Sequence, residues 1–178
     1  MKATEVYSPR EDTFFLLNFL RKQNFSGLNI LEIGTGTGII ADFLAEKNKV
    51  SATDINPKAI VYARKHSKNA KNINFIVSDL FKNSFFRNKK FDLIIFNPPY
   101  LPQDKNDDLI STTDNGVILR FLKKAKKYLT YEGRIILVLS NLSSKINFEY
   151  IQKNYAFKII KEKNLSFFEK LFLFLLSK

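Results

Sequence analysis

The chain has 178 residues and a mass of 20.7 kDa, which fits one domain of ordinary size. Hydrophobic residues make up 45% of it and charged residues 26%, so a wholly disordered chain is excluded. There is no cysteine and one histidine, His66, which excludes disulfides, cysteine-ligated zinc and thiol nucleophiles. Any chemistry must proceed without them.

The formal net charge of +12 suggests an anionic partner such as a nucleic acid. The excess is spread evenly, however. Residues up to Tyr100 include 15 basic and 9 acidic side chains and the rest include 14 and 8, so each part carries +6. The apolar run Leu171 to Leu176 is far shorter than the ~20 residues of a membrane span. We therefore expect a cytoplasmic protein that does not bind a membrane.

Helices and strands are predicted to alternate along the chain. The strands are expected at 28–33, 50–54, 73–77, 91–96, 134–139, 157–161 and 168–176, and the helices at 11–22, 39–47, 57–69, 117–129 and 144–153. This order predicts an α/β fold with a mostly parallel, seven-stranded sheet and helices on both faces. The last two strands can pair antiparallel as a hairpin.

Three glycines follow the first predicted strand. The segment Glu32-Ile33-Gly34-Thr35-Gly36-Thr37-Gly38 leads into a helix, where glycines let a ligand approach the backbone. The dinucleotide fingerprint does not fit, because its last position falls on Ile39, and a Walker loop would need Gly-Lys-Ser/Thr. The pattern E-x-G-x-G-x-G instead resembles the class I S-adenosylmethionine-dependent methyltransferases, and the acidic Glu32 suits a cationic ligand.

The resemblance also implies how the rest of the cofactor is bound. Asp54 ends the second strand and can accept hydrogen bonds from both ribose hydroxyls, and Asp79 matches the residue that holds the adenine amine. Each aspartate alone is as readily a turn or cap residue, but three acids at successive strand ends favour a site. The implied cofactor-binding set is Thr13, Glu32, Gly34, Gly36, Gly38, Asp54, Ile55, Asp79, Leu80 and Asn97.

The most informative element is Asn97-Pro98-Pro99-Tyr100, which follows the buried strand 91–96. The prolines fix the backbone, so the Asn97 side chain and the Pro98 carbonyl project rigidly from the strand end. These two acceptors can hold both N–H groups of a planar nitrogen, and Tyr100 can stack on the substrate group. We assign catalysis to Asn97, Pro98 and Tyr100 and substrate binding to these residues with Pro99. No metal is needed.

The opening Val6-Tyr7-Ser8-Pro9-Arg10-Glu11-Asp12-Thr13 narrows the family. Together with the glycine segment and Asn97 to Tyr100, it resembles the short HemK/PrmC-like protein glutamine methyltransferases of archaea and eukaryotes. This resemblance implies one Rossmann-like methyltransferase domain over 1–178, with a helical segment at 1–26 and the core at 27–178. It also implies S-adenosylmethionine as methyl donor, with S-adenosylhomocysteine as product, and the glutamine of the Gly-Gly-Gln motif of a class 1 release factor as acceptor.

Two charged segments bear on the substrate. The loop after Tyr100 contains Asp104, Asp107, Asp108 and Asp114, which would repel phosphates and attract a basic peptide, although a charged loop is most simply a solvated one. The loop has a single glycine, Gly116, where the family tends to show a Gly-Gly pair. The residues Lys123, Lys124, Lys126 and Lys127 are expected to face solvent, and can contact nucleic acid or the ribosome.

Short members of the family usually work with a small zinc-binding activator protein that adds a strand to the sheet. For this contact we select the strand 73–77 with Phe81, Phe85 and Phe86, although core packing explains these phenylalanines equally well. Two other functions remain open. The acceptor can be an exocyclic amine of adenine, cytosine or guanine in RNA or DNA, or the chain can be a silent scaffold that binds no cofactor.

Overall fold

The computed structural model describes residues 6–100 and 116–178 of the chain, and the structural statements below refer to these residues. A seven-stranded sheet lies at the centre, in the order β3-β2-β1-β4-β5-β7-β6. Its strands are β1 (Asn29–Ile33), β2 (Lys49–Asp54), β3 (Ile73–Val77), β4 (Phe91–Phe96), β5 (Leu129–Ser140), β6 (Ala156–Asn164) and β7 (Lys170–Ser177). The first five pair in parallel, and β7 pairs antiparallel with β5 and β6. The predicted fold class and closing hairpin are confirmed.

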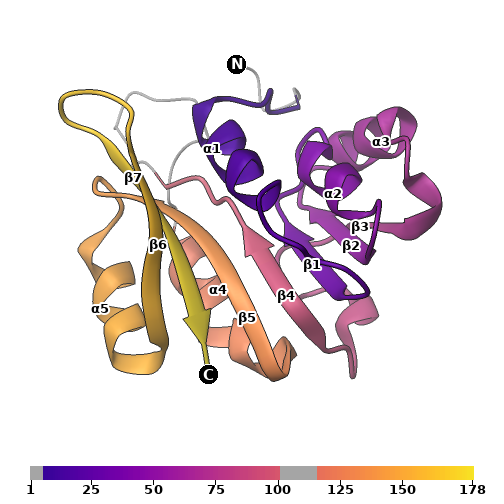
Figure 1. The fold of residues 1–178 in the computed structure, drawn as a ribbon. Helices are drawn as coiled ribbons and strands as arrows, with labels where there is room; N and C mark the ends of the chain where they lie inside the picture. Colours follow the sequence, from indigo (N-terminus) through magenta and orange to yellow (C-terminus); the bar gives the residue numbers. More distant parts are fainter. Residues whose placement is uncertain (1–5, 101–115) are drawn as a thin grey trace.

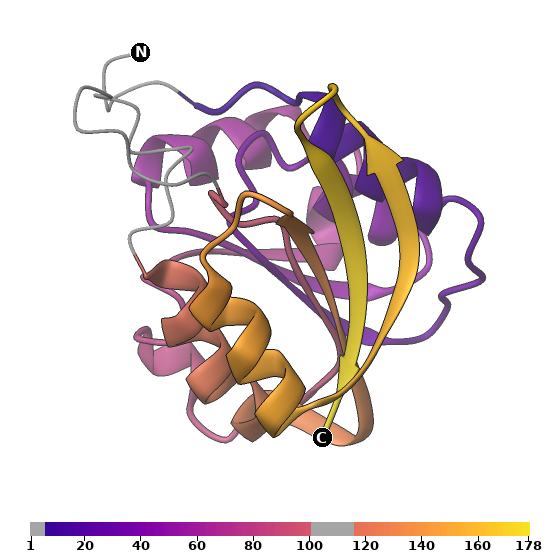
Figure 2. The same cartoon turned by 90° about the vertical axis from the view of Figure 1, so that its left-hand side faces the viewer.

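Helices cover both faces of the sheet (Figures 1 and 2). They are α1 (Glu11–Leu20), α2 (Ile39–Leu44), α3 (Pro57–His66), α4 (Val117–Ala125) and α5 (Lys145–Asn154). Alternate strand residues enter two separate clusters: Ile30 packs with residues of α1, α2 and α3, and Leu31 packs with residues of α4 and α5. This division follows from the strand geometry, which points successive side chains to opposite faces. In the part described, no helix is long and apolar enough to cross a membrane.

Strand β5 differs most from the prediction. The sequence predicted a helix up to Leu129 and a strand from Arg134, whereas the strand begins at Leu129, which pairs with Phe91 before a register shift. Gly133 makes the shift possible, because a Cβ there would lie 2.8 Å from the Phe91 carbonyl oxygen. The helical pattern did not reveal this long-range pairing. Helices α2 and α3 also end earlier than predicted, at Leu44 and His66.

Candidate active site

The glycine segment forms a tight loop between β1 and α2. Gly34, Gly36 and Gly38 all have positive φ, at 70°, 53° and 82°. The Thr35 N–H donates to the Thr53 carbonyl on β2 at 2.9 Å, which ties the loop to the neighbouring strand. A side chain at these positions would be strained, so the loop keeps its backbone open as the sequence predicted.

Glu32 lies buried beneath this loop. Its Oε2 accepts a hydrogen bond from Thr35 Oγ1 at 2.6 Å. Burial raises the pKa of the Glu32 carboxyl to about 8, and the nearby Asp54 raises it further, against the opposing hydrogen bonds from Thr35 and the Ala41 backbone. Glu32 therefore holds the loop in place, and near neutral pH its carboxyl retains a proton that a cationic ligand would displace.

Asp54 is aimed at the same loop. Its Oδ2 accepts from Gly36 N–H and its Oδ1 from Asn56 N–H, each at 2.9 Å. Burial raises the Asp54 pKa, and these backbone hydrogen bonds oppose the shift. Each carboxylate oxygen keeps a second lone pair, so the side chain remains able to accept from a pair of hydroxyls. The next residue, Ile55, is largely exposed beside it.

Asp79 differs from the other two acids, because it is ion-paired. Lys82 Nζ lies 2.7 Å and Arg120 Nη1 3.1 Å from its Oδ2. The hydrogen bond from Lys82 and the charge of Arg120 lower the Asp79 pKa. The adjacent Leu80 is buried with φ of 52°, and its carbonyl accepts from Ser78 Oγ at 2.7 Å. A ligand amine at Asp79 would compete with two cations, which the sequence did not indicate.

The Asn97 side chain is held by Asp12, a residue of the opening motif to which the sequence assigned no role in the site. Asn97 Nδ2 donates to Asp12 Oδ2 at 2.9 Å, and Asp12 is itself buried on α1. Because a carboxylate accepts hydrogen bonds, Nδ2 must face Asp12 and Oδ1 must face away. That Oδ1 is buried and has no hydrogen-bond partner among the described residues. An unsatisfied buried acceptor is costly, which points to a donor supplied from outside.

Tyr7 and Thr13 lie against Asp12. The Thr13 hydroxyl donates to Asp12 Oδ1 at 3.4 Å, and the Tyr7 hydroxyl lies 3.5 Å from the same atom. Burial followed by the charge of Asp12 raises the pKa of Tyr7 to about 12. The same two causes, then the charge of Glu169, raise the Tyr100 pKa. Both phenols therefore remain protonated and neutral across the physiological range.

The glycine loop and the Asn97 element meet at this edge of the sheet. A Cβ on Gly34 would lie 3.5 Å from the Phe96 ring and 4.0 Å from the Asn97 carbonyl oxygen, and one on Gly36 would lie 3.6 Å from the Tyr7 carbonyl oxygen. The predicted residues at the ends of β1, β2 and β4 and on α1 thus converge. Tyr7 and Asp12 belong to the opening motif but were given no role in the site, because the first turn of a helix readily accounts for an acid such as Asp12.

Other predictions need correction or stay untested. Phe81 and Phe86 are buried in the core, where Phe81 stacks on Tyr128 and Phe86 meets both rings edge to face, so they are not a partner surface, whereas Phe85 is partly exposed. Lys126 bonds to the Asn154 carbonyl and lies over the Tyr155 ring instead of facing solvent.

The acidic loop with Asp104, Asp107, Asp108 and Asp114 lies outside the described residues. Contact of Lys123, Lys124 and Lys127 with nucleic acid or the ribosome stays a prediction.

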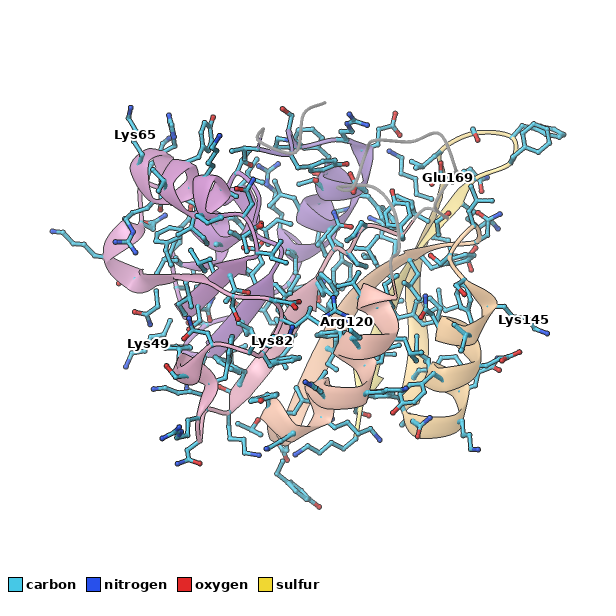
Figure 3. All side chains as sticks on the ribbon, turned by 180° about the vertical axis from the view of Figure 1, so that it is seen from behind. Lys49, Lys65, Lys82, Arg120, Lys145 and Glu169 are labelled. Carbon is cyan, nitrogen blue, oxygen red and sulfur yellow. The ribbon has the colours of Figure 1, made fainter. Side chains whose placement is uncertain are left out.

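In Figure 3 the labelled lysines Lys49, Lys65, Lys82 and Lys145 lie apart from one another on the surface. The described residues line at least two cavities. The larger, of about 530 Å³, lies along β3, and the second, of about 430 Å³, lies at the tip of the β6–β7 hairpin. Neither is lined by the glycine loop.

The sheet order and the convergence of a glycine loop with an Asn-Pro-Pro-Tyr element define a methyltransferase. The family described as "Methyltransferase small domain" matches residues 6–161. The chain belongs to this family.

Its relatives point to a subgroup. The chain is 37% identical over 153 residues to a putative protein N5-glutamine methyltransferase of Methanocaldococcus jannaschii, a match that covers 79% of this chain and 75% of that protein. It is 32% identical to the release factor glutamine methyltransferase of Fusobacterium nucleatum over 90% of this chain but 49% of that enzyme. Among solved structures, the chain resembles one in the E. cuniculi Mtq2–Trm112 complex, which is responsible for methylation of the termination factor eRF1. The two chains are 26% identical and superpose with a TM-score of 0.74, over 97% of this chain and 98% of that one.

Proposed function

We propose that the chain transfers a methyl group from S-adenosylmethionine to the side-chain amide nitrogen of a glutamine in a class 1 release factor. The observation that carries the proposal is the buried, unpartnered Oδ1 of Asn97, oriented by Asp12. The relatives support the acceptor class, since they include a putative protein N5-glutamine methyltransferase and a release factor glutamine methyltransferase.

The chain's residues fit the cofactor. Asp54 would accept from the ribose hydroxyls, and the loop from Gly34 to Gly38 would line the methionine part, with Glu32 beneath it. When bound, the cofactor supplies an electrophilic methyl on a sulfonium. Thr13, Ile55, Asp79 and Leu80 complete the proposed pocket, provided that the Asp79 ion pairs rearrange.

The acceptor amide requires positioning, because its nitrogen lone pair is delocalised. Asn97 Oδ1 and the Pro98 carbonyl would accept its two N–H groups and so aim the nitrogen at the methyl group, while Pro99 fixes the backbone and Tyr100 packs on the amide plane. The raised Tyr100 pKa keeps this ring neutral. Orientation alone can account for a large part of the rate.

Labelled S-adenosylmethionine tests the substrate class. The chain is incubated in parallel with a class 1 release factor, the same factor with the acceptor glutamine changed to alanine, total RNA and DNA. We expect label only in the unaltered factor, and label in RNA or DNA alone would overturn the proposal. Asn97→Ala should bind the cofactor yet lose at least about 100-fold in kcat, while Asn18→Ala, an exposed change on α1, should not.

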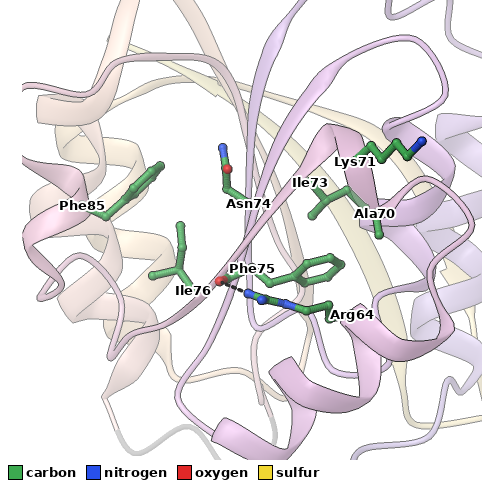
Figure 4. Close-up of a pocket in the computed structure, with 8 residues that line it drawn as sticks. All are labelled: Arg64, Ala70, Lys71, Ile73, Asn74, Phe75, Ile76 and Phe85. Atoms are coloured by element: carbon green, nitrogen blue, oxygen red, sulfur yellow. Dashed lines mark hydrogen bonds between the residues drawn. The ribbon is translucent and has the colours of Figure 1, made fainter.

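We further propose that a second protein adds a strand to the outer edge of β3, with which no other strand of the described residues pairs. The E. cuniculi relative forms a complex with Trm112, which supports a protein partner. The Ser78 N–H bonds to the Asp54 carbonyl of β2, so by alternation Phe75 and Val77 turn their backbone groups outward. The cavity of about 530 Å³ follows this edge, with Phe85 on one side and Arg64 on the other (Figure 4). We propose that this partner is a small protein that binds zinc.

A further inference from the structure

Two phenylalanines stand exposed at the tip of the β6–β7 hairpin. Phe167 is 96% and Phe168 78% exposed, and their rings meet edge to face with centroids 5.1 Å apart. Isolated exposed apolar residues are ordinary, but two adjacent aromatic rings that bury almost nothing contribute little to the fold. A contact outside the chain would explain them.

The turn that presents these rings is rigidly built. Asn141, directly after β5, donates from Nδ2 to the Phe168 carbonyl at 2.9 Å and accepts from Lys170 N–H at 2.7 Å. Ser166 Oγ accepts from the N–H groups of Phe168 and Glu169, at 3.3 and 3.1 Å. The rings are therefore held in place before any contact forms, which lowers the entropic cost of binding.

The hairpin tip lies at the same end of the sheet as the candidate active site. Asn141, which bonds to Phe168 at the tip, follows the C-terminal end of β5, and β5 runs parallel to β4, whose C-terminal end leads to Asn97. Figure 3 labels Glu169 in this turn. Near the end of β6, Lys163 pairs with Glu11 of α1 at 3.0 Å, so the hairpin contacts the helix that carries Asp12. The cavity of about 430 Å³ opens between Asn141 and the phenylalanines. The tip and Asn97 thus lie at the same edge of the sheet, where β4 and β5 end.

The charges at the tip favour a polypeptide over a nucleic acid. Within the described residues the Glu169 carboxylate is in no ion pair, whereas Lys170 is paired with Glu162 and Lys163 with Glu11. The unpaired charge beside the rings is thus negative and would repel phosphates. Because the bases of a single strand can also stack on aromatic rings, this charge decides between the two partners.

We propose that Phe167 and Phe168 dock the polypeptide substrate beside its acceptor residue, a role that rests on the proposed function. The two rings contact apolar side chains of the protein that presents the acceptor glutamine. One of these apolar side chains occupies the cavity of about 430 Å³ beside Asn141. The two rings take no part in the methyl transfer itself. Their contribution is to the affinity for the substrate protein.

The test compares the parent with Phe167→Ser/Phe168→Ser and with Tyr131→Ser, a matched control in which a 93% exposed ring lies near the start of β5. We measure the Kd of a labelled class 1 release factor by fluorescence anisotropy in the presence of S-adenosylhomocysteine, and the KM and kcat of methyl transfer. The double variant should raise Kd and KM at least tenfold, with kcat and cofactor affinity unchanged. Tyr131→Ser should change neither, and Phe167→Tyr/Phe168→Tyr should restore affinity.

Distinct outcomes separate the two proposals. If the parent methylates the release factor and the double substitution leaves KM unchanged, the docking role of the two rings is overturned while the proposed function stands. A parent that labels nucleic acid and no protein overturns both. If the parent sediments as a dimer and the double variant as a monomer, the rings serve self-association and the docking role is overturned.

Discussion

Asp12 Oδ2 and Asn97 Nδ2 lie 2.9 Å apart, joining the first turn of α1 to the end of β4 across 85 positions of sequence. This contact fixes which end of the Asn97 amide faces the active site. Asp12 is therefore a positioning residue, whose effect on catalysis acts through Asn97.

Replacing Asp12 tests that role. Asp12→Ala should lower kcat by about 100-fold, because the Asn97 amide is then free to rotate, while KM for the cofactor changes little. Asp12→Asn should recover much of the rate, since its carbonyl can still accept from Asn97 Nδ2. Steady-state kinetics separate the two parameters. If both variants lose kcat equally and both fall in thermal stability, Asp12 has a purely structural role.

Glu32 gives the protein a pH-dependent stability. Its pKa is raised to about 8 in the folded state from a usual 4.5, so the folded form binds a proton that the unfolded form releases. The free energy of unfolding should therefore fall as pH rises from about 4.5 to 8, by up to about 1.4 kcal/mol per pH unit from this group. Denaturant titrations of Glu32→Gln should show a flatter profile over that window. The raised pKa of Asp54 acts in the same direction, and Asp54→Asn serves as the comparison.

The features that depend on a local sequence pattern could be predicted, whereas those that depend on contacts between distant parts of the chain could not. That the glycine loop, Asp54 and Asn97 lie together could be predicted, because each occupies a fixed place at a strand end and the strand ends of a parallel sheet share one edge. Asp12 was not found because its partner lies far away in sequence. For Phe81 and Phe86 the sequence left a partner contact and core packing equally open, and the structure supports core packing because their neighbour Tyr128, which follows α4, comes from a distant part of the chain. Asp79 was placed correctly at its strand end, but the ion pair with Arg120 required the fold.

Gly38 marks a close approach of α2 to α3. A Cβ at this position would lie 2.7 Å from Ala63 Cβ, and φ is +82°. Gly38→Ala should therefore lower the free energy of unfolding by roughly 3 kcal/mol, through backbone strain and displacement of α3. Gly27→Ala has a similar φ of +73° with nothing within 4 Å, so it isolates the strain and should cost about 1 kcal/mol. Equal losses in urea titrations would mean that the helix contact carries no weight.

Arg64 caps the β3 edge that the proposed partner strand would use. Its Nη2 donates to the outward-facing Phe75 carbonyl at 3.2 Å, and Asn83 Nδ2 likewise occupies the Val77 carbonyl at 3.0 Å. An added strand must displace Arg64, which costs a charge-assisted hydrogen bond. Arg64→Ala should thus bind a Trm112-type partner about tenfold more tightly by calorimetry, and the adjacent exposed change Lys65→Ala should have no effect. Weaker binding by Arg64→Ala would instead make Arg64 a contact of the partner, and unchanged binding would place the partner away from this edge.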